Sequence, residues 1–431
     1  MLKEPIVQVA LDFLNIDQAM RVAREAVDGG ADWLEAGTPL IKAEGLDAVR
    51  KLREAFPDKT IVADMKVMDA GRIEVEAAAK AGANVVDVLG QATDETIAEC
   101  VEAGANYGAR ISVDLIAVSD PVQRAQQIAK LGPYAIAVHT GIDEQMHGKV
   151  SFDVLAEIAQ RVDVPLAVAG GINSQTCVAA VESGASIIIV GGAITKSPDA
   201  RKATEEIKRA VATGRPIVSQ LFRRVGEDQV RDVFLRVSTA DVSFAMHNAR
   251  EIEGVHPIRE GFKLAGPAFT VRTAAGDWAK PVEAIDHAKP GDVIVIDTGA
   301  KPPAVWGELA THSCKTRKIA GVVIDGAIRD TSQIKQMAFP AFARQIVPTA
   351  GDPKGLGEMD APIVVGGCRV RPGDWIVGDD DGVIVVPRHE AVEIANRAQD
   401  VLERENRIRA EIDAGSTLSS VVELDKWEKK T

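Results

Sequence analysis

A lysine stands between two carboxylates in the segment Asp64-Met65-Lys66-Val67-Met68-Asp69, directly after the apolar run Thr60–Ala63. Side chains of a strand alternate between two faces, so Asp64 and Lys66 are expected on one face and Asp69 in the following loop. A cation held against acids at a strand end can help to hold a metal ion and can stabilise an enolate oxygen. This segment alone leaves a second reading open, a solvated ion pair that ends an ordinary strand.

The first half of the chain repeats an apolar segment followed by a helical pattern roughly every 25 residues, about the length of one βα unit. Helical patterns such as Asp17–Gly29 and Ser174–Gly184 separate the apolar segments, and glycines that could end helices precede alanine at Gly30, Gly82, Gly104 and Gly184. Eight units predict a closed (β/α)8 TIM barrel. A doubly wound open sheet is disfavoured because no glycine-rich dinucleotide motif follows the first segment. The predicted strands are Ile6–Leu11, Trp33–Ala36, Thr60–Asp64, Val85–Val88, Arg110–Asp114, Ala135–His139, Leu166–Ala169 and Ile187–Val190.

Ionisable residues recur at the carboxyl ends of these predicted strands, where barrel enzymes place their active sites. Taken singly, His139 could be a structural histidine and Asp114 could cap a loop, but solvation alone explains six such groups poorly. Glycine pairs follow the last two strands, Gly170-Gly171 and Gly191-Gly192, the second preceding Ala193. These are the two places where barrels bind phosphate, so a phosphorylated substrate is expected, although tight turns would also use glycine. The six groups are Asp12, Glu35, Asp64, Lys66, Asp114 and His139.

Composition narrows the class of protein. The 431 residues are too many for one typical domain, and 46% hydrophobic with 26% charged residues describes a globular chain. A net charge of −13 makes nucleic-acid binding unlikely as a function, because such binding needs clustered Lys and Arg. Neither a membrane-spanning run nor a secretory signal is expected, so a cytoplasmic location is predicted. The scattered Cys100, Cys177, Cys314 and Cys368 are predicted to be buried free thiols.

The first half resembles the hexulose-6-phosphate synthases of the orotidine-phosphate decarboxylase superfamily. The resemblance rests on five segments, and the Asp-X-Lys-X-X-Asp motif that begins at Asp64 is shared by the whole superfamily. Two features favour the synthases over the ketogulonate-phosphate decarboxylases: an arginine is missing near His139, and Gly192 stands where those decarboxylases usually carry a phosphate-binding arginine. The five segments are Val9–Asp12, Glu35–Leu40, Asp64–Gly71, His139–Gln145 and Val190–Ile194.

The resemblance implies aldol condensation of formaldehyde with D-ribulose 5-phosphate, or the reverse cleavage, through a metal-stabilised enediolate. Glu35 and Asp64 would ligate Mg²⁺, with Mn²⁺ as an alternative, because an all-oxygen site disfavours Zn²⁺. His139 would be the base, Lys66 the cation beside the developing oxyanion, and Asp12 a contact of a sugar hydroxyl. Asp69 would reach across a dimer interface in the superfamily pattern. The predicted substrate- and phosphate-binding residues are Gly171, Gly191, Gly192, Ala193 and Asp114.

The pattern changes near Gly214-Arg215-Pro216, and we predict domains at residues 1–213 and 222–431. The strand–helix repetition is expected to stop in the second domain. Two similar turn–strand units, Lys289–Asp297 and Arg371–Asp379, each open with Pro-Gly-Asp after a basic residue, which indicates a tight turn into an apolar strand. A charged amphipathic helix is predicted from His389 to about Ile412, for solvated packing or an oligomer contact.

The second half resembles the family named for the regulator of ribonuclease activity A, which also includes class II pyruvate aldolases and oxaloacetate decarboxylases. The resemblance rests on Trp306–Ala310, Gly321–Asp330 and Asp379–Val383. It implies a swivelling β/β/α fold and trimers or hexamers. The aldolase signature of an acid followed by Arg-Asp is met by Glu308 and Arg329-Asp330.

In that reading Asp330 would hold Mg²⁺ and Arg329 would grip the carboxylate or enolate of a 2-oxo acid. A helix beginning near Trp306 would point its amides at the same anion, in a site that includes Glu308 and Leu309. A structural Arg–Asp pair on a turn remains open as the alternative.

Three readings of the whole chain follow. The first is a bifunctional enzyme, with a formaldehyde-handling barrel and a second metal-dependent lyase. The second keeps the barrel enzyme but makes the second half an interaction module for a ribonuclease or for oligomer formation. The third makes the barrel a sugar-acid-phosphate decarboxylase. A homo-oligomer is expected, either a dimer or a hexamer that joins a dimer-forming barrel to a trimer-forming domain.

Overall fold

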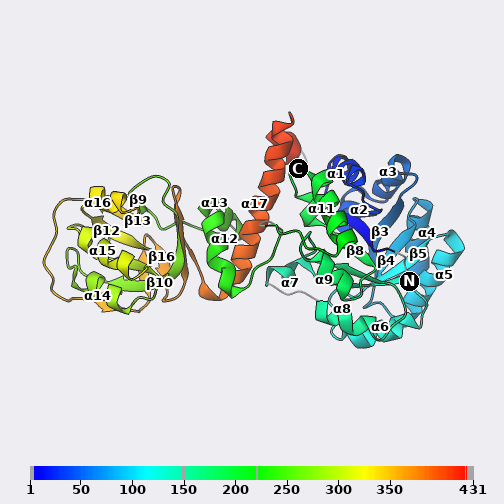
Figure 1. The fold of residues 1–431 in the computed structure, drawn as a ribbon, viewed down its shortest axis with the longest axis horizontal. Helices are drawn as coiled ribbons and strands as arrows, with labels where there is room; N and C mark the ends of the chain where they lie inside the picture. The colour runs from blue at the N-terminus through cyan, green and yellow to red at the C-terminus, as the bar shows by residue number, and fades with distance from the viewer. Residues whose placement is uncertain (1–3, 148–151, 220–221, 248, 423, 425–431) are drawn as a thin grey trace, which may run out of the picture. The chain divides into compact units, whose positions relative to one another are not determined.

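The computed structural model describes residues 4–147, 152–219, 222–247, 249–422 and 424 (Figure 1). The chain divides into two compact units. One comprises Met1–Gln145, Lys149–Arg224 and Glu403–Thr431, and the other comprises Met146–Gly148 and Val225–Leu402. The family-level boundaries expected from sequence, 1–213 and 222–431, stay a prediction. In the contact-based division, however, residues from Glu403 onward belong to the first unit.

The first unit is a closed barrel of eight parallel strands in sequence order, so the predicted TIM barrel is confirmed. Seven of the eight strands have the predicted bounds to within one residue, and β3 runs three residues further than expected. Long apolar runs form these strands because both faces of a parallel barrel are buried. The strands are β1 (Ile6–Leu11), β2 (Trp33–Ala36), β3 (Thr60–Val67), β4 (Val85–Leu89), β5 (Arg110–Asp114), β6 (Ala135–His139), β7 (Leu166–Ala169) and β8 (Ile187–Val190).

Amphipathic helices surround the strands and bury their apolar stripes against them (Figure 1). Glycines end several helices as expected, with positive φ at Gly30, Gly82 and Gly184. Gly104 does not: it lies inside its helix, where a Cβ would come within 2.8 Å of the Ala109 carbonyl oxygen, and the helix ends at Gly108. The helices are α1 (Ile16–Asp28), α2 (Thr38–Glu44), α3 (Asp47–Ala55), α4 (Gly71–Lys80), α5 (Asp94–Tyr107), α6 (Pro121–Ala129), α7 (Ile142–Met146), α8 (Phe152–Ala159), α9 (Cys177–Glu182), α10 (Gly192–Thr195) and α11 (Ala200–Thr213).

The second unit is built on a mixed sheet in the order β18-β17-β10-β11-β12-β13-β9, with β14 added beside β10. The expectation that strand–helix repetition stops here was wrong: β10, β11, β12 and β13 pair in parallel and alternate with helices. The fold class of a second α/β domain after the barrel is confirmed. Its strands are β9 (His256–Pro257), β10 (Leu264–Arg272), β11 (Val293–Asp297), β12 (Gly321–Ile328), β13 (Ala341–Ile346), β14 (Glu358–Met359), β15 (Ile363–Val365), β16 (Cys368–Val370), β17 (Trp375–Asp379) and β18 (Gly382–Val386).

Two apolar clusters hold this sheet between helices. The predicted Pro-Gly-Asp turns are present before β11 and β17, where Asp292 and Asp374 each accept the amide three residues earlier at 2.8 Å. The remaining elements are η1 (Glu227–Gln229), α12 (Val230–Arg236), α13 (Thr239–Ala245), α14 (Ala279–His287), α15 (Glu308–Thr316), α16 (Thr331–Gln336), η2 (Arg388–Glu390), α17 (Ala391–Asp413) and α18 (Leu418–Val421).

Helix α17 nearly matches the charged helix predicted from His389 to Ile412, but its environment is not simply solvated. Asn396, Gln399 and Glu403 are fully buried. Polar side chains at this depth require hydrogen-bond partners, so one side of α17 serves packing.

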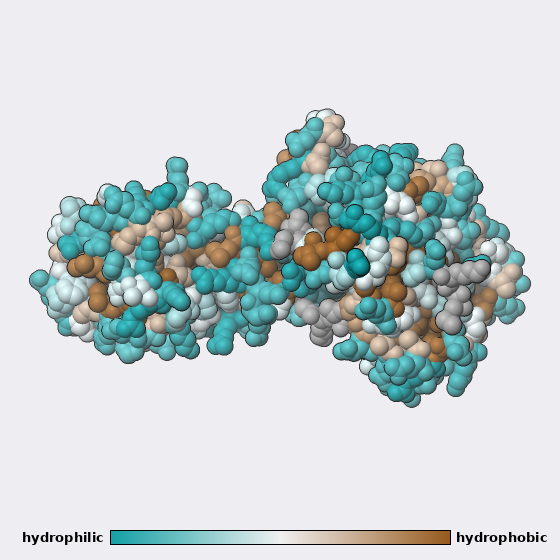
Figure 2. Space-filling view, in the orientation of Figure 1, coloured by the Kyte–Doolittle hydropathy of each residue, from teal (hydrophilic) through white to brown (hydrophobic). Residues whose placement is uncertain are grey.

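Hydrophilic side chains cover most of the visible face of the molecule (Figure 2). Within the described ranges, no helix is long and apolar enough to cross a membrane. All four cysteines are free, and three are buried as predicted, whereas Cys368 is partly exposed.

Candidate active site

The chain that carries Lys66 departs from regular strand geometry. The pairing of β3 with β4 shifts register between Ala63 and Val67, and Lys66 has a positive φ of 48°. A bulge re-aims a side chain, and a non-glycine residue held in this region costs roughly 1–3 kcal/mol. Lys66 therefore meets Asp64 through a bulge, where simple alternation along a strand was expected.

Lys66 lies between two carboxylates at the carboxyl ends of β3 and β5. Its Nζ is 3.0 Å from Oδ2 of Asp64 and 3.1 Å from Oδ2 of Asp114. The same Asp114 oxygen is 2.8 Å from Nδ1 of His139, at the end of β6. An ionised carboxylate only accepts hydrogen bonds, so Nδ1 is the donor and Nε2 is left as the basic nitrogen of a neutral ring.

Neighbouring charges shift the pKa values of Asp114 and Lys66 in opposite directions. Burial alone would raise the pKa of Asp114, but the hydrogen bond and charge of His139, with the charge of Lys66, bring it below its ordinary value. Burial alone would lower the pKa of Lys66, but Asp64 and Asp114 raise it well above its ordinary value. At neutral pH the structure thus presents a lysine cation and a histidine held by a carboxylate. Their side chains keep 24% and 22% of their surface exposed, which leaves both open to a ligand.

A second layer of acids lies deeper in the barrel. Burial, followed by the charges of Asp64, Asp87 and Asp12, raises the pKa of Glu35 well above its ordinary value. Burial and then the charge of Asp64 do the same to the pKa of Asp87 on β4. Gln8 on β1 donates to Glu35 Oε2 at 2.6 Å. Burial and neighbouring negative charges disfavour the ionised forms of Glu35 and Asp87. A cation bound beside them would favour the ionised forms.

Asp87 and Gln8 are site residues that sequence reasoning missed. The available signal was a single polar residue inside an otherwise apolar strand, as in Val85-Val86-Asp87-Val88. A buried parallel strand has little reason to carry a carboxylate except toward a site.

Asp12 directly follows β1 and faces two neighbouring loops. A Cβ built on Gly37 would lie 2.1 Å from Asp12 Oδ1, so a side chain there would displace the Asp12 carboxylate, and a Cβ on Gly191 would lie 3.6 Å from Oδ2. Burial raises the pKa of Asp12 above its ordinary value. Asp12 thus stands beside the turn after β8, between the acid layer and the predicted phosphate loops.

The two predicted phosphate loops follow β7 and β8. Glycine is required in the first loop, and a short helix forms in the second. Gly171 has φ 71°, and a Cβ on Gly170 would lie 2.2 Å from the Thr140 carbonyl oxygen. Helix α10 begins at Gly192 and contains Ala193, and a Cβ on Gly192 would lie 3.6 Å from Cδ of Lys196. Lys196 was also missed, although a lysine four residues after Gly192 falls on the same face of a helical turn.

Asp69 is not brought into this group. It is exposed in the loop after β3, where its Oδ1 accepts the amide of Ala70 at 2.7 Å. The prediction that it reaches a partner's site stays a prediction.

The chemistry of Glu35 and Asp64 suits a hard divalent cation, because both donors are carboxylates and the charge of Asp64 helps to raise the pKa of Glu35. Among the described residues, no group of three or more His, Cys, Asp or Glu side chains is arranged to hold a metal ion. Mg²⁺ often uses one or two protein carboxylates and completes its shell with water and substrate, so two acids are sufficient in principle.

In the second unit, the turn before α15 and the end of β12 come together. The amide of Arg329 donates to the Trp306 carbonyl at 3.0 Å, and a Cβ on Gly307 would lie 2.5 Å from Asp330 Oδ2. Arg329 Nε is 3.5 Å from Asp330 Oδ2, and both side chains are partly exposed. The sequence signature thus corresponds to one surface cluster.

Helix α15 begins at Glu308, two residues after the predicted start near Trp306, and its first amide is already engaged. The amide of Glu308 donates to Asp330 Oδ2 at 3.2 Å. Leu309, also assigned to the anion site, has a side chain that is 81% exposed. An anion at this helix end would therefore compete with, or bind beside, the Asp330 carboxylate.

Comparison with known proteins agrees with both units. Residues 5–207 match the family model described as orotidine 5'-phosphate decarboxylase / HUMPS family, and residues 239–385 match the RraA-like model, described as Aldolase/RraA. The 3-hexulose-6-phosphate synthase of Mycobacterium gastri is 40% identical over 205 residues, 48% of this chain and 99% of that protein. The enzyme of the same name from Bacillus subtilis is 40% identical over 208 residues, again 48% of this chain and 99% of that protein.

Both resemblances seen in the sequence are therefore confirmed. The chain belongs to the orotidine 5'-phosphate decarboxylase / HUMPS family through its barrel, which matches 3-hexulose-6-phosphate synthases, and it carries an RraA-like domain in its second half.

Proposed function

We propose that the barrel is a 3-hexulose-6-phosphate synthase, which condenses formaldehyde with D-ribulose 5-phosphate or runs the reverse cleavage. The observation that carries the proposal is the array of Asp64, Lys66, Asp114 and His139 at the barrel mouth. The relatives that span the barrel bear the name of this enzyme. The reaction needs a base for a proton beside a carbonyl and a cation for the oxygen that becomes negative.

In this reaction Nε2 of His139 takes the proton from C1 of ribulose 5-phosphate. Asp114 holds Nδ1 and stabilises the imidazolium that forms, while Lys66 faces the oxygen of the enediolate. The C1 carbanion equivalent then forms a bond to the carbon of formaldehyde, and the former aldehyde oxygen takes up a proton to become the new hydroxyl. Lys66 is already paired with two carboxylates, so its charge is held in place before the substrate oxygen develops its own.

A divalent cation, Mg²⁺ or Mn²⁺, fits beside Glu35 and Asp64, and it would polarise the substrate carbonyl and make its neighbouring proton more acidic. Asp12 would contact a sugar hydroxyl, since it lies between the loops after β2 and β8. The phosphate would lie against the backbone at Gly171, Gly191 and Gly192, with the Lys196 ammonium nearby.

The test is an assay of the intact chain with ribulose 5-phosphate, formaldehyde and Mg²⁺, following formaldehyde consumption and the hexulose phosphate formed. The Lys66→Met variant should lose activity by about 100-fold or more. Lys80→Met is the matched control, because Lys80 lies on the surface of α4 in an exposed pair with Glu76. No condensation by the wild type, with carbon dioxide release from a sugar-acid phosphate instead, would replace this proposal by the decarboxylase reading.

We propose for the second unit a metal-dependent lyase that acts on a 2-oxo acid. The supporting observation is the cluster of Gly307, Arg329 and Asp330, in which a partly exposed guanidinium stands beside a carboxylate. Arg329 would grip the carboxylate of the 2-oxo acid, and Asp330 would help to hold Mg²⁺.

The alternative for this unit is an interaction module. Oxaloacetate decarboxylation or pyruvate aldol cleavage by the intact chain, assayed with several divalent metals, separates the two. If neither occurs with any metal, the interaction module takes the place of the lyase.

A further inference from the structure

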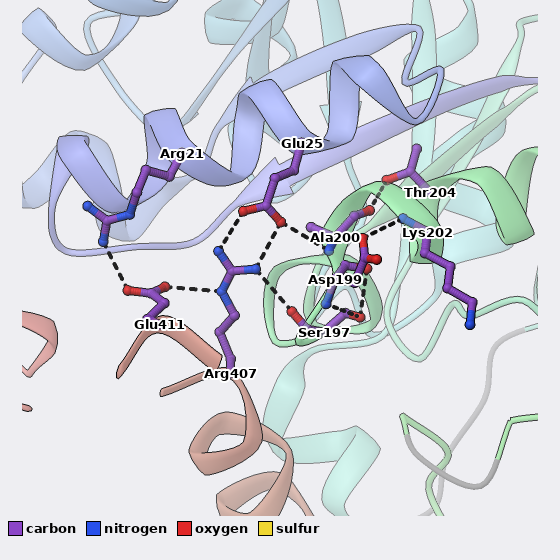
Figure 3. A network of polar contacts seen from close by, with 9 residues as sticks. All are labelled: Arg21, Glu25, Ser197, Asp199, Ala200, Lys202, Thr204, Arg407 and Glu411. Atoms are coloured by element: carbon purple, nitrogen blue, oxygen red, sulfur yellow. Dashed lines mark hydrogen bonds and ion pairs between the residues drawn. The ribbon is translucent and has the colours of Figure 1, made fainter. Parts of the chain in front are cut away.

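The C-terminal segment Glu403–Val422 packs within the barrel unit, and Arg407 on α17 makes its main polar contacts (Figure 3). The guanidinium forms a two-pronged pair with Glu25 of α1, Nη1 to Oε2 and Nη2 to Oε1, both 2.9 Å. Its Nε donates to Glu411 Oε1 at 3.0 Å, and Glu411 in turn pairs with Arg21 of α1. Further along, Gln18 of α1 donates to the Val421 carbonyl at 2.6 Å.

Arg407 also reaches the loop that follows the predicted phosphate turn. Its Nη1 donates to the Ser197 carbonyl oxygen at 3.2 Å. The amide of Ser197 closes the short helix α10 by donating to the Ile194 carbonyl at 3.1 Å. Ser197 is thus held at its amide by the phosphate-turn helix and at its carbonyl by the C-terminal segment.

Glu25 continues the connection on the other side of the same loop. Its Oε2, shared with Arg407, accepts the amide of Ala200 at 3.1 Å, at the first residue of α11. Asp199 caps that helix by accepting the amide of Lys202 at 2.9 Å (Figure 3). The Arg407–Glu25 pair therefore holds both ends of the link between α10 and α11.

The Arg407–Glu25 pair differs from an ordinary surface ion pair in its burial and its geometry. The Arg407 side chain is only 10% exposed, and a two-pronged arginine–carboxylate pair fixes geometry as well as charge. Removing the guanidinium takes away the contact with the Ser197 carbonyl and frees the Glu25 carboxylate, which is 34% exposed, so the loop loses two of its fixed contacts. The residues that match the barrel family end at 207 and those that match the RraA-like family end at 385, so Arg407 belongs to neither.

We propose that Arg407 is a positioning residue for the phosphate-binding turn after β8, acting through the Ser197 carbonyl and Glu25. The proposal rests on the proposed synthase function, because it assigns this turn to the phosphate of ribulose 5-phosphate. The C-terminal segment thus completes the barrel's substrate site from beyond the part of the chain that its relatives share.

The first test separates binding from chemistry in the intact protein. Arg407→Met keeps much of the apolar stem but removes the fork, and KM for ribulose 5-phosphate should rise roughly tenfold while kcat changes less than about threefold. Arg407→Lys keeps the charge without the two-pronged geometry and should recover part of the loss.

The control is Arg409→Met. Arg409 lies two residues along the same helix and is 57% exposed, and its guanidinium donates to Asn406 and Glu405 on the same helix. It should leave both constants at the wild-type value. A folded Arg407→Met protein with unchanged KM, or one that loses kcat alone, would overturn the proposal.

The second test does not depend on activity. Amide hydrogen exchange of the peptide 192–200 should be faster in Arg407→Met than in wild type and unchanged in Arg409→Met. If Arg407→Met does not fold, Glu25→Gln decides, because it leaves the arginine in place and weakens the same pair. If the peptide 192–200 exchanges at the same rate in wild type and in a folded variant that lacks the Arg407–Glu25 pair, the positioning role is contradicted. If wild type makes no hexulose phosphate, the synthase assignment fails. Faster exchange in Arg407→Met would then still show that Arg407 holds the turn after β8, but not that this turn binds the phosphate of ribulose 5-phosphate.

Discussion

His139 Nδ1 and Asp114 Oδ2 lie 2.8 Å apart, and the same Asp114 oxygen is 3.1 Å from Nζ of Lys66. One carboxylate thus orients the imidazole of His139 and the ammonium group of Lys66 together. Because the pKa of Asp114 is held below its ordinary value, this arrangement persists through neutral pH. In the proposed reaction, proton removal by His139 and charge stabilisation by Lys66 would therefore both depend on a single residue at the end of β5.

Replacing Asp114 by asparagine should lower kcat/KM by about 100-fold or more, since an amide neither stabilises the imidazolium nor fixes its tautomer reliably. The pH–rate profile of the variant checks this. Across the whole pH range kcat/KM should stay far below the wild-type value, because the carboxylate that holds Nδ1 of His139 and Nζ of Lys66 is gone. Asp58→Asn, at an exposed position before β3, should leave the profile unchanged. Near-wild-type kcat/KM of Asp114→Asn at any pH in the profile would contradict the assigned hydrogen bond.

Asp87 gives a prediction for stability. Its pKa is raised from an ordinary value of 3.8 by burial and by Asp64, so the folded state binds a proton more tightly than the unfolded chain. Stability from this group is present at low pH and falls as pH rises from the ordinary pKa to the raised one. In EDTA, Asp87→Asn should therefore unfold a few degrees higher than wild type at pH 8, with a smaller difference at pH 5. Identical melting temperatures at both pH values would count against the buried acid layer.

Mg²⁺ should stabilise the wild-type protein against heat, because it neutralises carboxylates that oppose each other. The Asp64→Asn and Glu35→Gln variants should lose most of that response and retain about 1% or less of the condensation activity. Melting curves with Mg²⁺ and with EDTA measure the first effect, and formaldehyde consumption measures the second. Near-normal, chelator-resistant activity of Asp64→Asn would refute the metal assignment.

Arg329→Ala and Asp330→Ala in the full-length protein should abolish any metal-dependent turnover of oxaloacetate while leaving formaldehyde condensation intact. The separation is expected because the two clusters lie in different compact units. Arg317→Ala is the matched control, since Arg317 pairs with Asp286 on the surface of the same domain. Loss of barrel activity in Arg329→Ala would show that the two sites are not independent.

Assembly is a separate prediction. A barrel family that builds sites at dimer interfaces, joined to a family that forms trimers, favours a closed hexamer. Light scattering of the intact protein should report an even number of subunits, with a dimer as the smallest acceptable result. Asp69, exposed and outside the Lys66 cluster, should then matter for activity only in the assembled form. A monomer that is fully active at assay concentration would exclude both the assembly and the role of Asp69.

The local sequence pattern was sufficient to predict the barrel and most of the acidic residues at its mouth. Each strand is a short, mainly apolar run that ends at a polar residue or a glycine, so the strand ends and the polar residues at or near them, Asp12, Glu35, Asp114 and His139, could be read directly. Pattern failed at Gly104, where packing against Ala109 and not a helix end requires glycine. It also failed after residue 222, where β10, β11, β12 and β13 continue the strand–helix alternation before the antiparallel strands β17 and β18 add to the same sheet.

Sequence by itself determined the family, the barrel and the residue types at its mouth, because these depend on periodicity and on motifs within a few residues. Tertiary structure decided what no local pattern contains: the bulge that turns Lys66 toward Asp64, the burial that makes Asp87 a site residue, and the Arg407 contact with Glu25. Arg407 and Glu25 are 382 positions apart. Such a pair forms only after the whole chain has folded, because the hydrogen bonds and burial that define it come from elements that are neighbours in space and not in sequence.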